Sequence, residues 1–362
     1  MTGRLEQVME PERNSFNLVR LLAAASVIGS HAFLISNGTG SPEPLWSLTG
    51  LTLGQHAVHI FFVVSGLTLA RSIKVSPNIA SYAVARFLRI VPALIGFGVL
   101  FAFFIGPFVS SAPWVDYFSS RETWLYPLTV WLEFQHTAPP PKVLESVPIS
   151  GAINNPLWTI KYEIFAYVGL GLVAVSGLLR FGWFLVALLS TSLALTIILR
   201  PFEISDGWGA LFQAAKFGSC FLLGVVAYKY RSAIPTSALW LLVSLAIATA
   251  LGNTSLALLA FIVLDAHLAL VVGSHDFAAL SAWTRSNDMS YGTYIYGWPT
   301  HQSLIALFPG IGMWSGGVST LLIAMALGYL SWRVVEKPAL SLKRKIKLGK
   351  ELVLSSSKPS KS

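Results

Sequence analysis

Residues 16–36 read FNLVRLLAAASVIGSHAFLIS, a run of 21 residues that contains a single Lys, Arg, Asp or Glu. This length matches the roughly 20 apolar residues that a helix needs to cross the hydrocarbon core of a bilayer. Similar runs recur along the chain, the mean hydropathy is +0.65, and only 11% of the residues are charged, against about 25% in a soluble domain. Because backbone groups in hydrocarbon must be paired internally, and because the runs lack the alternation of barrel strands, the sequence predicts an all-α, polytopic membrane helix bundle.

About ten transmembrane helices are predicted, with both termini cytoplasmic. The positive-inside rule assigns the Lys-rich and Arg-rich segments between spans to the cytoplasm, and the opposite side then holds only Arg121, Lys142 and Arg200. The spans are expected at residues 16–36, 53–71, 90–110, 157–178, 181–199, 208–228, 236–252, 254–272, 290–308 and 313–333.

One long outer loop is expected at residues 110–155. Within it, Trp124–Leu132 is apolar but short for a span, and counting it as an eleventh span would move the basic C-terminal end outside. We therefore expect an interfacial or re-entrant piece here. The stiff Pro139–Pro140–Pro141 run follows it.

The chain is expected to hold a membrane domain at residues 1–345 and a basic, disordered cytoplasmic tail at residues 346–362. Much of the net charge of +9 lies towards this end, where Lys and Arg directly follow the last span and suit a contact with anionic lipid. The tail lacks interleaved aromatic residues, so no nucleic-acid partner is expected. The single cysteine, Cys220, excludes an internal disulfide, and no cleavable signal peptide is expected at the start.

Three ionisable residues inside predicted spans suggest function, because charge within a membrane is costly. Arg20 and His31 are eleven residues apart in the first span, which places them on one helix face about 16 Å apart along the axis. The ordinary alternatives are an arginine that reaches for the interface and a core histidine bonded to a neighbouring helix. Glu163, on the outer half of the fourth span, needs either a charged partner or a wet cavity.

His56 and His59 lie three residues apart, on one face of the second span. Histidine binds metals readily, but no Asp, Glu or Cys lies nearby in the sequence at the spacing of a metal ligand, so no metal is expected. Lys216 and Asp265 lie in two later spans and could neutralise each other.

Arg71, Arg86 and Arg89 form a basic cluster at the cytoplasmic entry of the second and third spans. Guanidinium groups suit phosphate recognition, although ordinary positive-inside charge explains the cluster as well. Tyr291 and Tyr294 open the ninth span on one face, where an aromatic interface belt is the ordinary alternative.

Six segments, in order, resemble the acyltransferase family 3 membrane proteins, which O-acylate carbohydrates. They are Arg20-x10-His31, AVHIFFVVSG at residues 57–66, RFLRIVP at 86–92, PLWTIKYE at 156–163, SYGTYIY at 290–296 and WRVVEKP at 332–338. The resemblance extends over residues 14–345, and the family's ten spans agree with the charge pattern. Relatives often carry His where this chain has Gly297, and His301 stands one turn further on. We expect no soluble hydrolase-like domain of the kind that some relatives carry.

The resemblance implies transfer of an acyl group, usually acetyl, from cytoplasmic acyl-CoA to a hydroxyl of a cell-surface or exported glycan. On that basis His31, Glu163 and Arg20 are the expected catalytic residues, with His31 as general base or as transient carrier of the acyl group. Acetyl-CoA is expected at Arg71, Arg86 and Arg89, and the acceptor at Trp158, His59, Tyr291 and Tyr294. The expected location is the bacterial plasma (inner) membrane, with membrane lipid, a glycan or lipid-linked glycan, and polysaccharide assembly machinery as partners.

Two other functions are compatible with many spans. A polytopic transporter or flippase for a glycan or an acyl carrier would also place ionisable groups inside the membrane, although no inverted repeat is visible. A structural membrane protein that positions a polymerase or an export machine is the third reading. The transporter reading explains the clustered arginines at one cytoplasmic mouth less well than an enzyme does.

Overall fold

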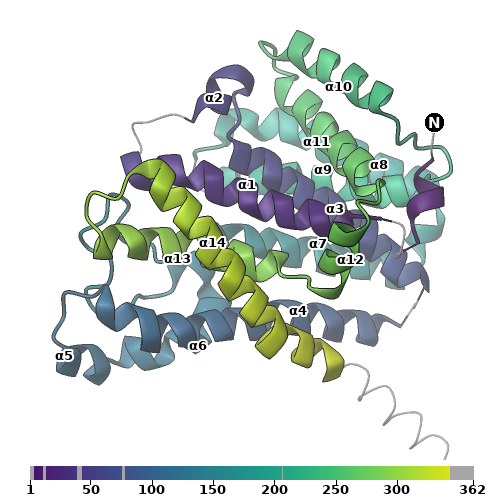
Figure 1. Cartoon of the computed structure of the whole chain (residues 1–362). Helices are drawn as coiled ribbons and strands as arrows, with labels where there is room; N and C mark the ends of the chain where they lie inside the picture. Colours follow the sequence, from purple (N-terminus) through teal and green to yellow (C-terminus); the bar gives the residue numbers. More distant parts are fainter. Residues whose placement is uncertain (1–3, 11–13, 39–42, 76–77, 206, 343–362) are drawn as a thin grey trace, which may run out of the picture.

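The computed structural model describes residues 4–10, 14–38, 43–75, 78–205 and 207–342, and every regular element in these ranges is a helix. This confirms the predicted all-α membrane bundle. The predicted tail at residues 346–362 lies outside the described residues. The first described residues and the end of the last helix lie toward the same end of the bundle (Figure 1). The orientation of the bundle in the membrane stays a prediction.

Each predicted span overlaps one helix. These helices are α1 (Phe16–Asn37), α3 (Leu53–Val75), α4 (Ile79–Leu100), α7 (Ile160–Val175), α8 (Gly182–Leu199), α9 (Trp208–Lys229), α10 (Ala238–Leu251), α11 (Ala257–Gly273), α13 (Ser290–Leu307) and α14 (Met313–Ser331). Among the described residues, seven helical stretches are long and apolar enough to cross a membrane, and α10 and α11 are apolar but shorter. The number of crossings therefore stays a prediction.

The helix α4 begins eleven residues before the predicted span at 90–110. The side chain of Asn78 caps its first turn by accepting a hydrogen bond of 2.9 Å from the Ser81 amide. The prediction began the span after Arg86 and Arg89, which was wrong for the helix because both arginines lie within α4. The helical path then continues through short π and 3-10 turns to Phe108.

The long outer loop contains two helices, α5 (Trp114–Ser119) and α6 (Arg121–Glu133). The thirteen residues of α6 extend about 20 Å, less than the roughly 30 Å hydrocarbon core. This agrees with a piece too short to span. The helix packs closely on α4, since a Cβ added at Gly98 would lie 2.6 Å from the Cα of Pro127. Further short helices are α2 (Pro44–Thr49) and α12 (Ala279–Ser286).

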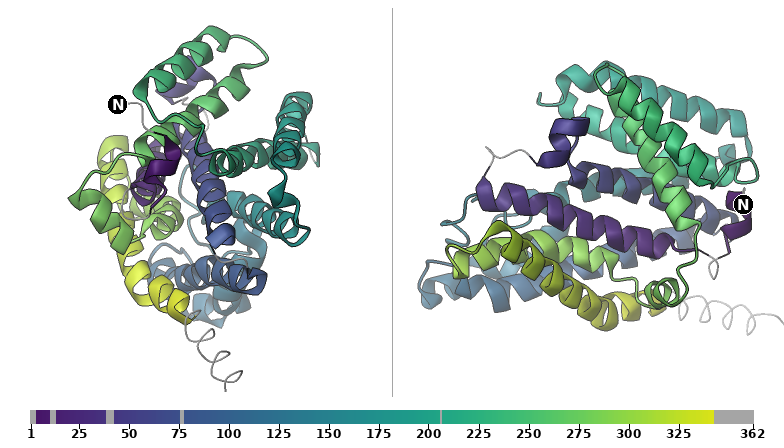
Figure 2. Two further views of the ribbon diagram at one scale, coloured as in Figure 1. Left: turned by 90° about the vertical axis from the view of Figure 1, so that its right-hand side faces the viewer. Right: turned by 45° about the horizontal axis from the view of Figure 1, so that its top comes forward.

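The most enclosed helix is α13, which packs against α1 and α14 (Figures 1 and 2). Every residue from Ser290 to Ser303 is buried. Because other helices rather than lipid surround this stretch, it tolerates several polar side chains such as His301 and Gln302. The enclosed position of α13 makes its surroundings the natural place for a buried polar site.

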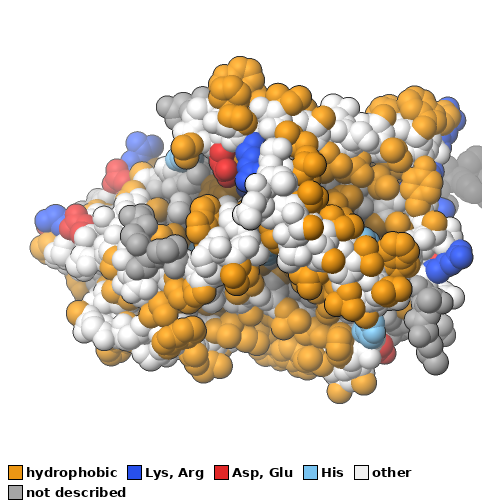
Figure 3. All heavy atoms as spheres, turned by 90° about the horizontal axis from the view of Figure 1, so that it is seen from above, with side chains coloured by type: hydrophobic (Ala, Val, Ile, Leu, Met, Phe, Trp, Pro, Cys, Tyr) orange, Lys and Arg blue, Asp and Glu red, His pale blue; other side chains and the backbone are white. Residues whose placement is uncertain are grey.

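The outer surface is largely apolar, as a membrane bundle requires. Figure 3 shows hydrophobic side chains over much of the flank, with most charged groups toward the two ends of the molecule. Large exposed side chains include Leu242, Phe165 and Leu322, each at least 61% exposed. Exposed apolar surface of this extent suits contact with lipid chains rather than water.

Two glycines allow α3 and α9 to approach each other closely. A Cβ at Gly66 would lie 1.9 Å from the carbonyl oxygen of Phe221, and a Cβ at Gly224 would lie 2.0 Å from that of Val63. Both obstacles are backbone atoms, which cannot move aside as a flexible side chain can. Small residues of this kind are typical of contacts between membrane helices.

We predict that Gly66→Val lowers the melting temperature of the purified protein, because overpacking between two backbones costs about 1–3 kcal/mol or more. Gly29→Ala in α1 is the matched control, since nothing lies within 4 Å of a Cβ there. Thermal unfolding in detergent measures both variants. Equal melting temperatures for the two would contradict the close α3–α9 contact.

Candidate functional site

A small chamber lies where α1, α3, α7 and α13 meet. Its volume is about 40 Å³, which is room for a few water molecules. Four predicted site residues line it together with Ser65, and they are Arg20, Glu163, Tyr291 and Tyr294. The structure thus brings these four side chains into one place, which we call the Arg20–Glu163 chamber.

The two charged residues of the chamber retain unused hydrogen-bonding capacity. Arg20 is half-buried, and its Nε has no hydrogen-bond partner among the described residues. Glu163 is half-buried too and accepts a hydrogen bond from the hydroxyl of Tyr167, one turn further along α7. Charges with few partners in an apolar bundle are costly, so a chamber of this kind is a candidate binding site.

The two tyrosines of the chamber differ in their bonding. The Tyr294 hydroxyl lies 2.8 Å from both the Pro156 carbonyl oxygen and the Thr159 hydroxyl, which fixes its position. The Tyr291 hydroxyl is buried without a hydrogen-bond partner among the described residues. Tyr291 can therefore donate a hydrogen bond to a molecule in the chamber.

The chain before α7 runs deep into the bundle alongside α13. The Gln302 side chain donates to the Ile149 carbonyl at 2.6 Å, and the Trp298 indole donates to that of Ala152 at 3.2 Å. The Asn154 side chain in turn donates to the Ile295 carbonyl at 2.8 Å. Consequently α7 begins deep in the bundle, and Glu163 near its start lines the same chamber as Tyr291 near the start of α13. The expectation that Glu163 lies on the outer half of its span stays a prediction, as the orientation of the bundle does.

His31 lies outside the chamber. Its ring meets Trp298 edge-on, with the ring centroids 5.0 Å apart, and His301 is near enough to interact with it electrostatically. Trp298 follows Tyr291 by seven residues of α13, which puts His31 roughly 10 Å from the level of the chamber. No contact between His31 and Glu163 is found among the described residues.

A packed contact separates the two levels. Ile28 lies one turn before His31 on α1, and a Cβ added at Gly297 would lie 2.6 Å from the Cγ1 of Ile28. A histidine at position 297 would displace Ile28, so this chain could not carry that side chain without rearrangement. His301 lies on the same side of this contact as His31, and its Nε2 lies 3.2 Å from the Ser36 hydroxyl.

Arg89 is engaged within the protein. Its guanidinium lies 2.9 Å from an oxygen of Asp288 and 3.3 Å from one of Glu336, and the Glu336 side chain is fully buried. Burial acts to raise the pKa of Asp288, but the guanidinium of Arg89 and then that of Arg20 lower it, and the net pKa is below the ordinary value. Arg89 is therefore paired with two carboxylates of the protein itself, and its expected contact with a donor phosphate stays a prediction.

Three further predicted site residues, Arg86, Arg71 and Trp158, do not line the chamber. Arg86 lies over the ring of Tyr167, with its Cζ 5.7 Å from the ring centroid, and is thus one residue removed from Glu163. Arg71 is half-buried near the end of α3. Trp158 packs against Phe217, with centroids 5.6 Å apart, rather than lining the chamber.

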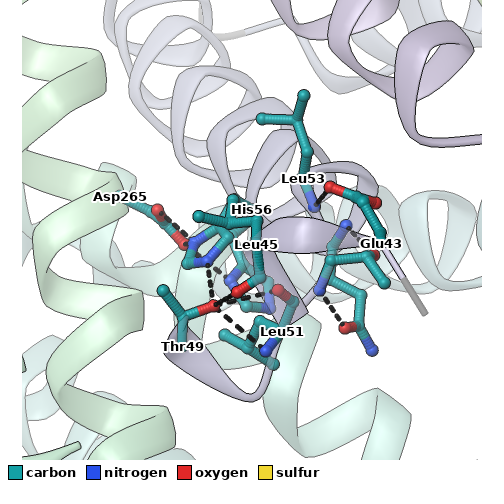
Figure 4. Close-up of polar contacts among 10 residues, drawn as sticks. Glu43, Leu45, Thr49, Leu51, Leu53, His56 and Asp265 are labelled. Atoms are coloured by element: carbon teal, nitrogen blue, oxygen red, sulfur yellow. Dashed lines mark hydrogen bonds and ion pairs between the residues drawn. The ribbon is translucent and has the colours of Figure 1, made fainter. Parts of the chain in front are cut away.

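A second polar cluster joins His56 and His59 of α3 to Asp265 of α11. Both Nδ1 atoms lie 2.8 Å from a carboxylate oxygen of Asp265, and His59 is fully buried. Figure 4 shows His56 directed at Asp265 and Thr49. The three ligand atoms lie within 4.8 Å of one another, close enough for a metal ion. The two contacts of 2.8 Å are also ordinary hydrogen-bond distances.

The sequence missed this cluster because Asp265 is more than 200 residues away from both histidines. Lys216 and Asp265, for which the sequence left a pairing open, form no ion pair with each other among the described residues, and Lys216 lies 4.0 Å from Glu203 instead. Because His59 is enclosed and bonded to Asp265, it is not available to an acceptor in the chamber.

The chain is similar to known acyltransferases. A family model described as an acyltransferase domain matches residues 13–333. An O-acetyl transferase of Shigella phage Sf6 is 28% identical over 336 residues, which cover 90% of this chain and 95% of that protein. Nodulation protein 10 of Rhizobium leguminosarum bv. viciae is 28% identical over 371 residues, which cover 91% and 94%. No solved structure matches the chain significantly.

We predict that Arg89→Ala destabilises the protein by about 3–5 kcal/mol, because it leaves the buried carboxylate of Glu336 and the partly buried one of Asp288 without their cation. Arg121→Ala, at an exposed position, is the control and should cost less than about 1 kcal/mol. Denaturant unfolding and acetyl-CoA binding are measured for both. A normally stable Arg89→Ala protein with weakened acetyl-CoA binding would show that Arg89 serves the donor after all.

Proposed function

The chain belongs to the acyltransferase family whose domain model covers residues 13–333, and we propose that it transfers an acetyl group from acetyl-CoA to a hydroxyl of a glycan. The family and the apolar helices make it a membrane acyltransferase. The name of the phage relative, an O-acetyl transferase, supports acetyl as the group and oxygen as the acceptor atom. The observation that carries the proposal is the Arg20–Glu163 chamber in the centre of the family domain.

The donor is proposed to enter from the side of Arg71 and Arg86. Arg86 is half-buried and forms no ion pair among the described residues, so its guanidinium can still bind a phosphate. From there the acyl end of the CoA arm reaches Arg20, which lines the chamber. The Tyr291 hydroxyl and the Arg20 guanidinium would then stabilise the negative charge that develops on the thioester oxygen.

The acceptor hydroxyl is proposed to lose its proton to His31. The hydroxyl oxygen attacks the thioester carbonyl carbon, the carbon–sulfur bond breaks, and the CoA thiolate takes up the proton that His31 had accepted. His31 lies toward the outer side of the chamber on the same α1 face as Arg20, so donor and acceptor would meet between the two residues. The Ile28–Gly297 contact must yield for them to meet, because it lies between the two levels.

The acceptor and its cellular setting follow from the family and from the relatives. A glycan or a lipid-linked glycan is proposed as acceptor, and polysaccharide assembly machinery as a partner. The two relatives come from a bacterium and from a phage of a bacterium, which supports the bacterial plasma (inner) membrane as the location.

We predict that His31→Ala lowers acetyl transfer by at least about a hundredfold, because general-base catalysis contributes roughly 10²–10⁴-fold. Radiolabelled acetyl-CoA is incubated with membranes that contain the protein and their own glycans, and the label in the glycan fraction is counted. His136→Ala, at an exposed histidine of the outer loop, is the control and should retain full activity.

Glu163→Gln tests the chamber in the same assay. The variant keeps the size of the side chain and removes its charge, so transfer should fall by roughly tenfold or more while the protein remains folded.

Two outcomes would contradict the proposal. Full activity of the His31→Ala variant would show that His31 is not the base. Uptake of the glycan into vesicles without any labelled ester would favour a transporter instead.

A further inference from the structure

A larger cavity opens on the flank opposite the Arg20–Glu163 chamber. It is an apolar groove of about 760 Å³ between α1, α2, α3, α10 and α11. The residues of α11 that line it extend from Phe261 to Val272, about 16 Å along the helix, or half of the roughly 30 Å hydrocarbon core. We call this cavity the His56 groove. Its length matches the depth of one leaflet of a bilayer.

The polarity of the His56 groove changes along its length. His56, Asp265, Thr49 and Thr249 supply polar groups toward the end covered by α2, and Ser26 of α1 adds a hydroxyl. The opposite end, from Leu268 to Val272 on α11 and from Val19 to Ala23 on α1, is apolar. Neither Lys nor Arg is among the described residues that line the groove. A ligand that fits this gradient has a long apolar chain and an uncharged polar end.

Of the two ring nitrogens of His56, Nδ1 is held closely and Nε2 only by a long contact. Its Nδ1 lies 2.8 and 3.0 Å from the two oxygens of Asp265, whereas its Nε2 lies 3.3 Å from the Thr49 hydroxyl (Figure 4). The Thr49 hydroxyl has shorter contacts with the carbonyls of Leu45, at 3.0 Å, and Leu51, at 2.9 Å. The contact between His56 and Thr49 is therefore the weakest of the group, and a hydroxyl that enters the groove can replace it.

A second groove of similar size provides the comparison. It has a volume of about 690 Å³ between α7, α8 and α9, and its lining holds no charged or histidine side chain among the described residues. The Ser192 hydroxyl there is occupied by the Ala215 carbonyl at 2.9 Å. A groove that only accommodates lipid chains needs no buried carboxylate, and Asp265 is 3% exposed and costly to bury. The polar cluster of the His56 groove thus calls for a different explanation.

We infer that the His56 groove binds a membrane lipid that has a long apolar chain and an uncharged hydroxyl at its polar end. The chain lies along α11, and the hydroxyl bonds to the His56 imidazole, which Asp265 holds in place. A phosphate head group is disfavoured, because the cluster contains a carboxylate and the groove lacks a cationic lining. This site lies on the other face of α1 and α3 from the chamber and does not depend on the proposed acetyl transfer.

The test uses the full chain in lipid nanodiscs and two photoactivatable probes. One probe is a long-chain alcohol that carries a diazirine, and the other is the matching hydrocarbon without the hydroxyl. Labelling of α10 and α11 peptides is quantified by mass spectrometry. We expect the alcohol to label these peptides roughly two- to tenfold more strongly than the hydrocarbon, the ratio that one net hydrogen bond produces.

Three variants locate the effect. His56→Phe should remove the preference for the alcohol, and Leu268→Trp, which fills the groove but leaves the polar cluster intact, should remove the labelling by both probes. Leu188→Trp fills the comparison groove and should change nothing. Equal labelling of the wild-type protein by the two probes would overturn the inference. So would a preference that survives His56→Phe, or labelling that persists in Leu268→Trp.

Discussion

The free-energy cost of burying charge in an apolar bundle governs how this protein arranges its polar residues. Where partners exist, they are held closely, as in the pairing of Arg89 with Asp288 and Glu336 at 2.9 and 3.3 Å. Arg20 and Glu163 differ from this ion pair, because they share a small chamber and have few hydrogen-bond partners. Ionisable residues inside a membrane bundle often mark a functional site, so the chamber stands out from the structural ion pairs around it.

The sequence was sufficient to predict the helices, because the physical signal is strong and local. A run of about 20 apolar residues has few alternatives in hydrocarbon, and each predicted span coincides with a helix. Four site residues, Arg20, Glu163, Tyr291 and Tyr294, also come together as the motifs suggested. They come together because α1, α7 and α13 each contribute residues to the lining of the same chamber.

The errors arose where long-range packing decides the outcome. Asp265 is the partner of His56 across more than 200 residues, and no spacing in the sequence announces it. The pairing of Arg89 with Glu336 is equally hidden in the sequence, because Glu336 belongs to a different motif near the other end of the domain. The depth of Glu163 depends on a non-helical segment that enters the bundle, which hydropathy does not reveal. Sequence reasoning thus found the residues that carry charge but not all of their partners.

The most direct measurement is the structure, by cryo-electron microscopy, of the protein with a non-transferable acetyl-CoA analogue. We predict density for the acyl end in the Arg20–Glu163 chamber, with the phosphates against Arg86 and Arg71 and with Ile28 displaced from Gly297. Density for the acyl end on the opposite face of α1, or phosphates bound by Arg89 in place of Glu336, would contradict this prediction.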